Sequence, residues 1–360
     1  MQFTVEKKAF ADALAHVGAV IPNNSPRAIL QNVLLEADSS QHLYLYGTDL
    51  EVSLRLRLDA RVDVPGEILL PAKQLVGLAK RLSGDSINFT VADDVASISC
   101  GKGAFTFACA NKEDYPTLAT DIPDTAVVMA GRDFADAVAK TVVAVGKGET
   151  RYATNGLNIS IGNGTAEFAA TDTLRLSIVK KPVEGDLGVT GIVLVKGVTL
   201  AARLAAECEQ VRVFISESEL FVNTGNTSLR SRLIDGRYPA YQSIADEKGA
   251  SSFIVERQKF LHALSAVGIV ADGESGGLDL ILSENSITIH NDTVSSAKGS
   301  ITMEAVIDGP PITIRVNHVF LNDALRVLGS DEVTLVYSDN TSALFVVYGD
   351  YTNIVMPINR

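Results

Sequence analysis

Apolar and polar residues alternate along much of the chain with the period of β-strands, and stretches with helical spacing interrupt this pattern. Phe3-Thr4-Val5 opens the chain as a strand, and Phe10, Leu14 and Val17 then fall on one face of a helix. A further alternating run follows at 52–58. The pattern predicts an α+β fold that is rich in strands and largely antiparallel.

The same pattern occurs three times along the chain. The segment 10–14, which begins with Phe10, returns at 134–138 and at 260–264, so that its copies lie about 125 residues apart. Other landmarks keep this spacing: Thr48-Asp49 returns as Thr171-Asp172 and more loosely as Asp292-Thr293, and Tyr115-Pro116 returns as Tyr238-Pro239. A period this long is a whole domain rather than a short solenoid repeat. We therefore predict three similar domains, at 1–118, 126–245 and 252–360.

Each domain has two predicted helices. The first helix begins with the Phe-led segment, and the second begins near Lys73, Lys196 or Asn317. The expected order within a domain is β-α-β-β-β-α-β-β-β-β.

Charge is distributed unevenly along the chain. The net charge is −12, which argues against a protein that holds nucleic acid mainly by neutralising phosphates. The six predicted helices nevertheless carry a net charge of +8, so the remainder carries −12 − 8 = −20. These helices span 7–20, 72–82, 132–147, 196–206, 256–269 and 317–328. We expect a shared basic surface on the helices, although solvated helix faces would explain any one of them.

Sequence signals for catalysis or metal binding are weak. The five histidines have no metal-ligand spacing, and no metal or other cofactor is expected. Gly146-Lys147-Gly148 and Ser295-Ser296-Ala297-Lys298 match phosphate-loop and S-x-x-K motifs only by letters. Asp49, Asp172 and Asp292 could suggest a carboxylate triad, but each follows a strand, where Asx turns are the simpler interpretation. We predict no catalytic residues.

The compartment is expected to be the cytoplasm. The three cysteines are an odd number without paired spacing and are typical of free thiols in a reducing environment. The start of the chain lacks the layout of a signal peptide, and no apolar run is long enough to span a bilayer, so we expect no membrane association.

Several segments, in order along the whole chain, resemble the bacterial sliding clamp family, the beta subunits of DNA polymerase III. They are 47–51 (GTDLE), 70–73 (LPAK), 113–116 (EDYP), 151–156 (RYATNG), 170–176 (ATDTLRL), 235–239 (DGRYP) and 355–357 (VMP). The resemblance implies a DNA clamp fold of three tandem domains, with antiparallel sheets outside and helices lining a ring. It also implies a non-catalytic processivity factor that encircles double-stranded DNA without sequence specificity.

The resemblance further implies partners and sites. The partners are a second copy of the chain in a head-to-tail homodimer, the alpha subunit of the replicative polymerase, the clamp loader and other proteins with a short hydrophobic clamp-binding motif. The basic helix residues would face DNA: Lys73, Lys80, Arg81, Lys140, Lys196, Arg203, Arg257 and Lys259. For the dimer, Phe105 and Phe107 would meet Ile269 and Val270.

The family's pocket for partner peptides falls on fourteen positions of this chain. They are Thr154, Thr171, Thr173, Leu174, Arg175, Leu176, Pro239, Ile244, Asn317, Phe320, Ala343, Met356, Pro357 and Ile358. Leu176, Phe320 and Met356 could instead be ordinary core residues.

This chain departs from the family pattern within the pocket. Thr173-Leu174 stands where the family usually has Gly-His, and Thr154 stands where it usually has Leu. A specialised clamp with altered partner preference is therefore one alternative. Two others are a three-domain scaffold that never touches nucleic acid and a hydrolase that uses the Asp or Ser/Lys features.

Overall fold

The computed structural model describes residues 1–116, 122–148, 152–247, 249–271, 276–294 and 297–358. The chain separates into two compact units, and each is described by itself. Unit 1 comprises Met1–Gly131 and Arg203–Leu233, and unit 2 comprises Arg132–Ala202 and Ile234–Arg360. All of the strand pairs in the described residues whose register is defined are antiparallel, as predicted. No helix within the described ranges is long and apolar enough to cross a membrane.

Unit 1 contains two sheets. The five-stranded sheet has the order β5 (Arg61–Val64), β1 (Gln2–Glu6), β7 (Ser86–Ala92), β8 (Val95–Cys100) and β9 (Gly103–Ala108). The eight-stranded sheet has the order β10 (Val127–Ala130), β15 (Gln210–Ile215), β16 (Glu219–Asn223), β17 (Thr227–Arg232), β4 (Val52–Asp59), β3 (His42–Thr48), β2 (Asn32–Ala37) and β6 (Gly66–Pro71). Because β17 pairs with β4, this sheet joins the first and second sequence repeats.

Unit 2 also contains two sheets. The nine-stranded sheet has the order β14 (Val189–Leu194), β11 (Gly156–Gly162), β12 (Thr165–Thr171), β13 (Arg175–Pro182), β26 (Tyr351–Val355), β25 (Leu344–Tyr348), β24 (Glu332–Tyr337), β18 (Ser251–Glu256) and β22 (Val306–Asp308). The four-stranded sheet has the order β21 (Ala297–Glu304), β20 (Ser286–Val294), β19 (Gly277–Ser283) and β23 (Ile312–Asn317). The pairing of β13 with β26 joins the second and third repeats.

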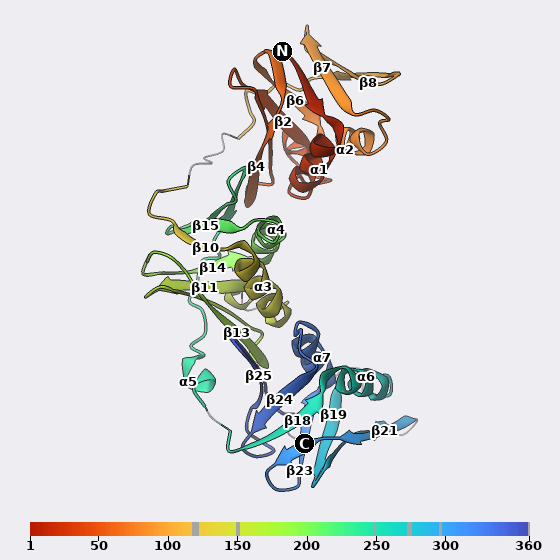
Figure 1. Ribbon diagram of the computed structural model, residues 1–360, viewed down its shortest axis with the longest axis vertical. Helices are drawn as coiled ribbons and strands as arrows, with labels where there is room; N and C mark the ends of the chain where they lie inside the picture. The colour runs from red at the N-terminus through yellow and green to blue at the C-terminus, as the bar shows by residue number, and fades with distance from the viewer. Residues whose placement is uncertain (117–121, 149–151, 248, 272–275, 295–296, 359–360) are drawn as a thin grey trace. The chain divides into compact units, whose positions relative to one another are not determined.

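The helices lie where the Phe-led segments and their partners predict them. In unit 1, α1 (Lys7–Gly18) packs against α2 (Ala72–Ala79), and in unit 2, α6 (Arg257–Gly268) packs against α7 (His318–Arg326) (Figure 1). Two more helices, α3 (Gly131–Thr141) and α4 (Val195–Ala205), belong mostly to unit 2, and α5 (Gln242–Ala245) is a short turn of helix. Short 3-10 turns span Ala28–Gln31, Val142–Ala144 and Tyr152–Asn155.

The repeated helix is explained by its apolar face. Phe10, Ala13, Leu14 and Val17 are buried in α1, and the same spacing buries the corresponding four residues of α6, which are Phe260, Ala263, Leu264 and Val267. Positions three, four and seven residues apart lie on one helical face, so each copy places one stripe against its sheet. The side chain of Glu6 caps α1 by accepting hydrogen bonds from the amides of Lys8 and Ala9.

Two details of the predicted elements are wrong. Four or five strands lie between the two helices of a repeat and three follow the second helix, whereas three and four were expected. In the first repeat the missed strands are β5 and β6, which Pro65 separates. The helix predicted at 132–147 ends at Thr141, because the β-branched Val142 and Val143 continue as a 3-10 turn.

Candidate functional site

Two matching turns connect strands in the first and second repeats. In the second repeat, Asp172 Oδ1 accepts hydrogen bonds from the amides of Leu174 and Arg175, both at 3.0 Å. In the first repeat, Asp49 Oδ1 accepts from the amides of Glu51 at 3.0 Å and Val52 at 2.7 Å. The prediction of Asx turns is confirmed for both aspartates. The side chain of Asp292 lies outside the described residues.

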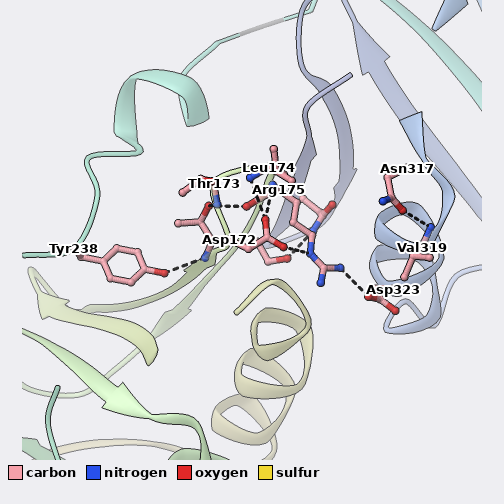
Figure 2. A network of polar contacts seen from close by, with 11 residues as sticks. Asp172, Thr173, Leu174, Arg175, Tyr238, Asn317, Val319 and Asp323 are labelled. Carbon is pink, nitrogen blue, oxygen red and sulfur yellow. Dashed lines mark hydrogen bonds and ion pairs between the residues drawn. The ribbon is translucent and has the colours of Figure 1, made fainter. Parts of the chain in front are cut away.

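The second repeat's turn differs from the first because it contains a buried arginine. Arg175 donates from Nε to Asp172 Oδ2 at 3.0 Å and from Nη1 to Asp323 Oδ2 at 2.7 Å (Figure 2). Its guanidinium carbon lies 4.4 Å from the centroid of the Phe320 ring. Asp323 and Phe320 both belong to α7. Arg175 therefore ties the β12–β13 turn of the second repeat to a helix of the third.

A tyrosine fixes the other side of the same turn. The amide of Thr171 donates to the hydroxyl of Tyr238 at 2.9 Å, and the amide of Thr173 donates to Thr171 Oγ1 at 3.0 Å (Figure 2). Burial raises the pKa of Tyr238 to about 12, although the bond from Thr171 opposes this shift. The hydroxyl is therefore neutral at physiological pH and acts as a fixed polar anchor.

An apolar cluster lies beside this turn in unit 2. Its buried members come from the four neighbouring strands β12, β13, β26 and β25, from the residue before β25 and from the segment before α5: Ala169, Leu176, Ile178, Tyr241, Ala343, Phe345 and Ile354. Tyr238, Ala245 and Val336 pack against it. The C-terminal segment joins the turn, because the amide of Met356 donates to the carbonyl of Leu174 at 2.9 Å.

Three large apolar side chains near this cluster in the fold are exposed. Leu174 is 56% exposed, Ile244 38% and Met356 37%. The Leu174–Met356 backbone bond brings two of them together at the start of β13 and the end of β26. An apolar cluster with exposed apolar residues beside it has the character of a binding site for an apolar segment.

The other predicted pocket residues have mixed surroundings. Leu176 and Ala343 are buried in the cluster, while Pro239, Phe320, Pro357 and Ile358 are partly exposed. Asn317 caps α7 by accepting from the amide of Val319 at 2.9 Å (Figure 2). Thr154 is buried in the 3-10 turn before β11, and its carbonyl accepts from the amide of Gly146 at 2.8 Å. The alternative interpretation of these positions as ordinary core residues therefore fits the buried Leu176 but not the exposed Met356.

The predicted DNA-facing residues fall into two groups. Six are exposed: Lys73, Lys80, Arg81, Lys196, Arg203 and Lys259. The other two are less exposed and have contacts within unit 2. Lys140 is buried and forms ion pairs with Asp136 at 2.8 Å and Asp350 at 3.6 Å. Arg257 donates to the carbonyls of Ser330 at 2.5 Å and Leu325 at 3.3 Å. The assignment of Lys140 to a DNA-facing surface is corrected, because its ammonium group is buried and paired with two carboxylates of unit 2.

The predicted dimer residues lie near the edges of the two smaller sheets. Phe105 is 39% exposed on β9, the last strand of the five-stranded sheet, and Phe107 on the same strand is partly exposed. Ile269, which directly follows α6, is 85% exposed, and Val270 is partly exposed. Gly299 on the edge strand β21 lies against Val270.

No group of three or more potential metal ligands occurs among the described residues. Ser295 and Ser296 of the S-x-x-K match lie outside the described residues. The Gly146-Lys147-Gly148 segment follows a 3-10 turn rather than a strand, and the next described element is another short 3-10 turn, Tyr152–Asn155.

Three family models cover nearly the whole chain. They describe the N-terminal, central and C-terminal domains of the DNA polymerase III beta subunit and match residues 1–119, 129–240 and 243–358. The chain belongs to this family. The predicted clamp fold of three similar domains is confirmed, and the chain is a DNA sliding clamp. The family is a non-catalytic processivity factor of DNA polymerase III, so the hydrolase and scaffold alternatives are not favoured.

Relatives and solved structures agree over full length. The beta sliding clamp of Pseudomonas putida is 28% identical over 99% of this chain and 100% of its own length, and that of Chlamydia muridarum is 25% identical over 96% and 98%. A Pseudomonas aeruginosa DnaN sliding clamp bound to griselimycin has a TM-score of 0.94 at 28% identity, with both chains fully covered. A C. crescentus beta sliding clamp has a TM-score of 0.92 at 26% identity and covers 100% of this chain and 99% of its own.

Sequence reasoning missed two residues that build the site. Tyr238 was noted as a repeated landmark, but its bond to Thr171 was not foreseen. Asp323 was not considered, because nothing in the local pattern of α7 signals a partner 148 residues earlier in the chain. The signal available for both was the combination of Arg175, a charged residue between the apolar Leu174 and Leu176, with the family's pocket positions.

Proposed function

We propose that two copies of this chain join head to tail into a closed ring around double-stranded DNA and tether the replicative polymerase to it. The observation that carries the proposal is the three-repeat match along the whole chain. A head-to-tail contact must either close or extend into a filament. Two copies of three similar domains give six domains, a number that suits closure into a ring.

The DNA contact is proposed to be weak and independent of sequence. Six exposed basic residues remain on or next to α2, α4 and α6, which are Lys73, Lys80, Arg81, Lys196, Arg203 and Lys259. Against a net charge of −12, so few cations provide little affinity for phosphates. A ring does not need strong binding, since it is retained topologically and its mobility benefits from weak contacts.

Partner proteins are proposed to bind the apolar cluster of unit 2. A short hydrophobic motif, from the polymerase alpha subunit, the clamp loader or other partners, would place its apolar side chains beside Leu174 and Met356. The anchored turn supports this, because Arg175 and Tyr238 hold it from two sides. A preformed site costs less conformational entropy on binding than a flexible one. Tethering then raises the polymerase's effective concentration at its template.

The ring requires a stable dimer, and this can be tested by sedimentation velocity. We expect the wild-type chain to sediment as a dimer at micromolar concentration and the Ile269→Glu variant as a monomer. A charge at a position that is buried between copies would be desolvated without a partner. Phe105→Glu should act in the same way from the other side of the contact.

Val306→Glu is the matched control, because Val306 is also a strongly exposed aliphatic residue but lies on β22, at the edge of the nine-stranded sheet. This variant should remain a dimer. A wild-type chain that sediments only as a monomer would remove the ring from the account.

A further inference from the structure

The eight-stranded sheet of unit 1 has one covered face and one polar face. Leu43, Leu45, Leu54 and Leu56 of β3 and β4 are buried on the face against which α1 packs. Alternate residues of a strand point to opposite faces. The residues between these leucines, which include Arg55, therefore lie on the other face.

A row of polar residues crosses this second face over five strands. Tyr46 of β3 is opposite Arg55 of β4, Arg55 is opposite Ser228 of β17, Ser228 is opposite Asn223 of β16, and Asn223 is opposite Arg212 of β15. Directly opposed residues share a face of the sheet. Two long arginines thus flank the shorter side chains of Ser228 and Asn223, which leaves a depression between them.

A third arginine completes the depression. Arg57 lies two residues beyond Arg55 on the same face of β4, and its amide donates to the carbonyl of Asn226 at 2.8 Å. The guanidinium carbon of Arg55 lies 4.0 Å from the centroid of the Tyr44 ring, which orients it along the sheet surface. The result is a cavity of about 280 Å³ lined by the three arginines together with Asn223, Asn226 and Ser228.

The charges around this cavity are mainly positive. The described residues that line it include no carboxylate. Asp124 lies 3.7 Å from Arg212 Nη2 but is fully exposed, so water screens this pair. Glu36 accepts a hydrogen bond from the Tyr46 hydroxyl at 2.6 Å, which places it on the far side of Tyr46. Arg212 Nη2 also donates to the carbonyl of Pro123 at 2.9 Å, which fixes its position.

The floor of the cavity is polar and ordered. Asn223 Nδ2 donates to Ser228 Oγ at 2.9 Å, and the amide of Gly225 donates to Asn223 Oδ1 at 2.9 Å. Gly225 has a φ of 89°, which suits glycine and lets the β16–β17 turn close tightly beside the arginines.

The architecture of the sheet does not require arginines here. The junction between the second and third repeats has the same strand pairing, with Ala169 at the position of Tyr46 and Ile178 at the position of Arg55. There the equivalent residues are part of the apolar cluster of unit 2. The same place in two repeats is thus apolar at one junction and cationic at the other, which points to a ligand of different chemistry.

We propose that the arginine cavity binds a phosphoryl oxyanion, with a diphosphate or triphosphate group preferred over a single phosphate. Guanidinium groups pair with phosphate oxygens in a bidentate manner. Three of them match the charge of a diphosphate better than that of orthophosphate. The group could come from a free polyphosphate or from a nucleic-acid strand, and both sources present the same oxygens.

Isothermal titration of the full-length protein with pyrophosphate tests the proposal. We expect one site per chain, weaker binding of orthophosphate, and at least a tenfold loss of pyrophosphate affinity in the Arg57→Gln/Arg212→Gln double variant. Arg61→Gln is the matched control, since Arg61 is an exposed arginine of the same unit on β5, and it should bind as wild type. Circular dichroism checks that each variant is folded, and Arg57→Gln alone should still weaken binding.

Further titrations distinguish a nucleic-acid strand from a free polyphosphate as the source of the phosphates and test whether the binding is specific to the arginines. A short single-stranded oligonucleotide that competes with pyrophosphate, and is weakened by the same double variant, would identify a nucleic-acid strand as the source of the phosphates. The Lys73→Gln/Lys80→Gln variant should leave pyrophosphate binding unchanged. The proposal is overturned if pyrophosphate gives no saturable heat, if this lysine variant loses as much affinity as the arginine variant, or if a tetraglutamate peptide binds more tightly than pyrophosphate.

Discussion

Single residues explain where this chain differs from its family. Thr173 and Leu50, at equivalent positions of two turns, both have a φ of 78°. This region is unfavourable for residues with a side chain and most of all for β-branched ones. The usual glycine of the family at the position of Thr173 therefore has a physical reason. The bonds to Asp172 and Tyr238 hold the turn in this conformation despite the strain.

Replacing Thr173 by glycine should stabilise the protein. Relief of the positive φ is worth about 1 kcal/mol, partly offset by the greater flexibility of glycine in the unfolded chain. Urea denaturation would show a higher midpoint for Thr173→Gly and for Leu50→Gly. Asn163→Gly is the control, because Asn163 also has a positive φ but asparagine tolerates it. A lower midpoint for Thr173→Gly would mean that its side chain contributes more than the strain costs.

A second residue-scale feature is the ionic cluster around Asp136. Asp136 Oδ2 lies 2.8 Å from the ammonium groups of both Lys140 and Lys181, and Asp350 contacts Lys181 at 2.6 Å. Burial acts against the charged form, but the two lysines outweigh it and lower the pKa of Asp136. Because the folded pKa lies below the unfolded one, the stabilisation is present above the unfolded pKa. It is lost as the pH falls through the folded pKa.

Asp136→Asn should destabilise the protein by about 1–3 kcal/mol at neutral pH, since two buried ammonium groups lose a carboxylate that they share. The difference from wild type should shrink as the pH falls below the unfolded pKa of about 3.9 and through the lower pKa of the folded Asp136. Asp12 is the equivalent residue of the first repeat, and its pair with Lys8 is exposed. Asp12→Asn should change the free energy of unfolding by less than about 0.5 kcal/mol. Equal effects of the two substitutions would contradict the role assigned to the cluster.

At the scale of elements, local pattern was sufficient for the helices and insufficient for the sheets. The Phe-led helices were predictable because one buried stripe recurs at a fixed spacing in each repeat. The strands β5 and β6 are not predicted from the pattern because Pro65, between them, and Gly66, at the start of β6, interrupt the alternation. The continuous sheets were not predictable, because β17 pairs with β4 and β26 with β13 across more than 150 residues, and no local signal selects such partners.

The candidate pocket likewise combines features that the sequence predicts with features that depend on long-range packing. Its positions follow from the family resemblance, but which of them are accessible depends on the packing of β13, β26 and α7. Leu176 is buried, so replacing it with alanine would cost core stability as well as any partner contact. Leu174 and Met356 are exposed and provide a cleaner test.

The Leu174→Ala/Met356→Ala variant should bind a C-terminal peptide of the polymerase alpha subunit at least tenfold more weakly than wild type, because truncating buried apolar contacts costs about 1–3 kcal/mol. Fluorescence anisotropy with a labelled peptide measures this, and sedimentation should show an unchanged dimer. Val306→Ala, an exposed aliphatic position outside the apolar cluster, is the control. Unchanged peptide affinity in the double variant would place the partner site elsewhere.

At the scale of the whole molecule, the charge balance determines how DNA can be held. A chain of net charge −12 with a small set of exposed basic helix residues would be a poor binder of open DNA. The same balance suits a protein that is retained by enclosure, because weak contacts permit sliding. The correction of Lys140 strengthens this point, since even fewer cations are available for phosphates than the sequence indicated.

Retention on DNA of different topology tests enclosure most directly. The protein, assembled on a nicked circular plasmid with the proposed clamp loader, would be separated from free protein by gel filtration before and after the plasmid is cut once. The account predicts that the protein elutes with the circle and is lost when the DNA is linear. Equal retention on circular and linear DNA would show that the chain holds DNA by its surface and would contradict the ring.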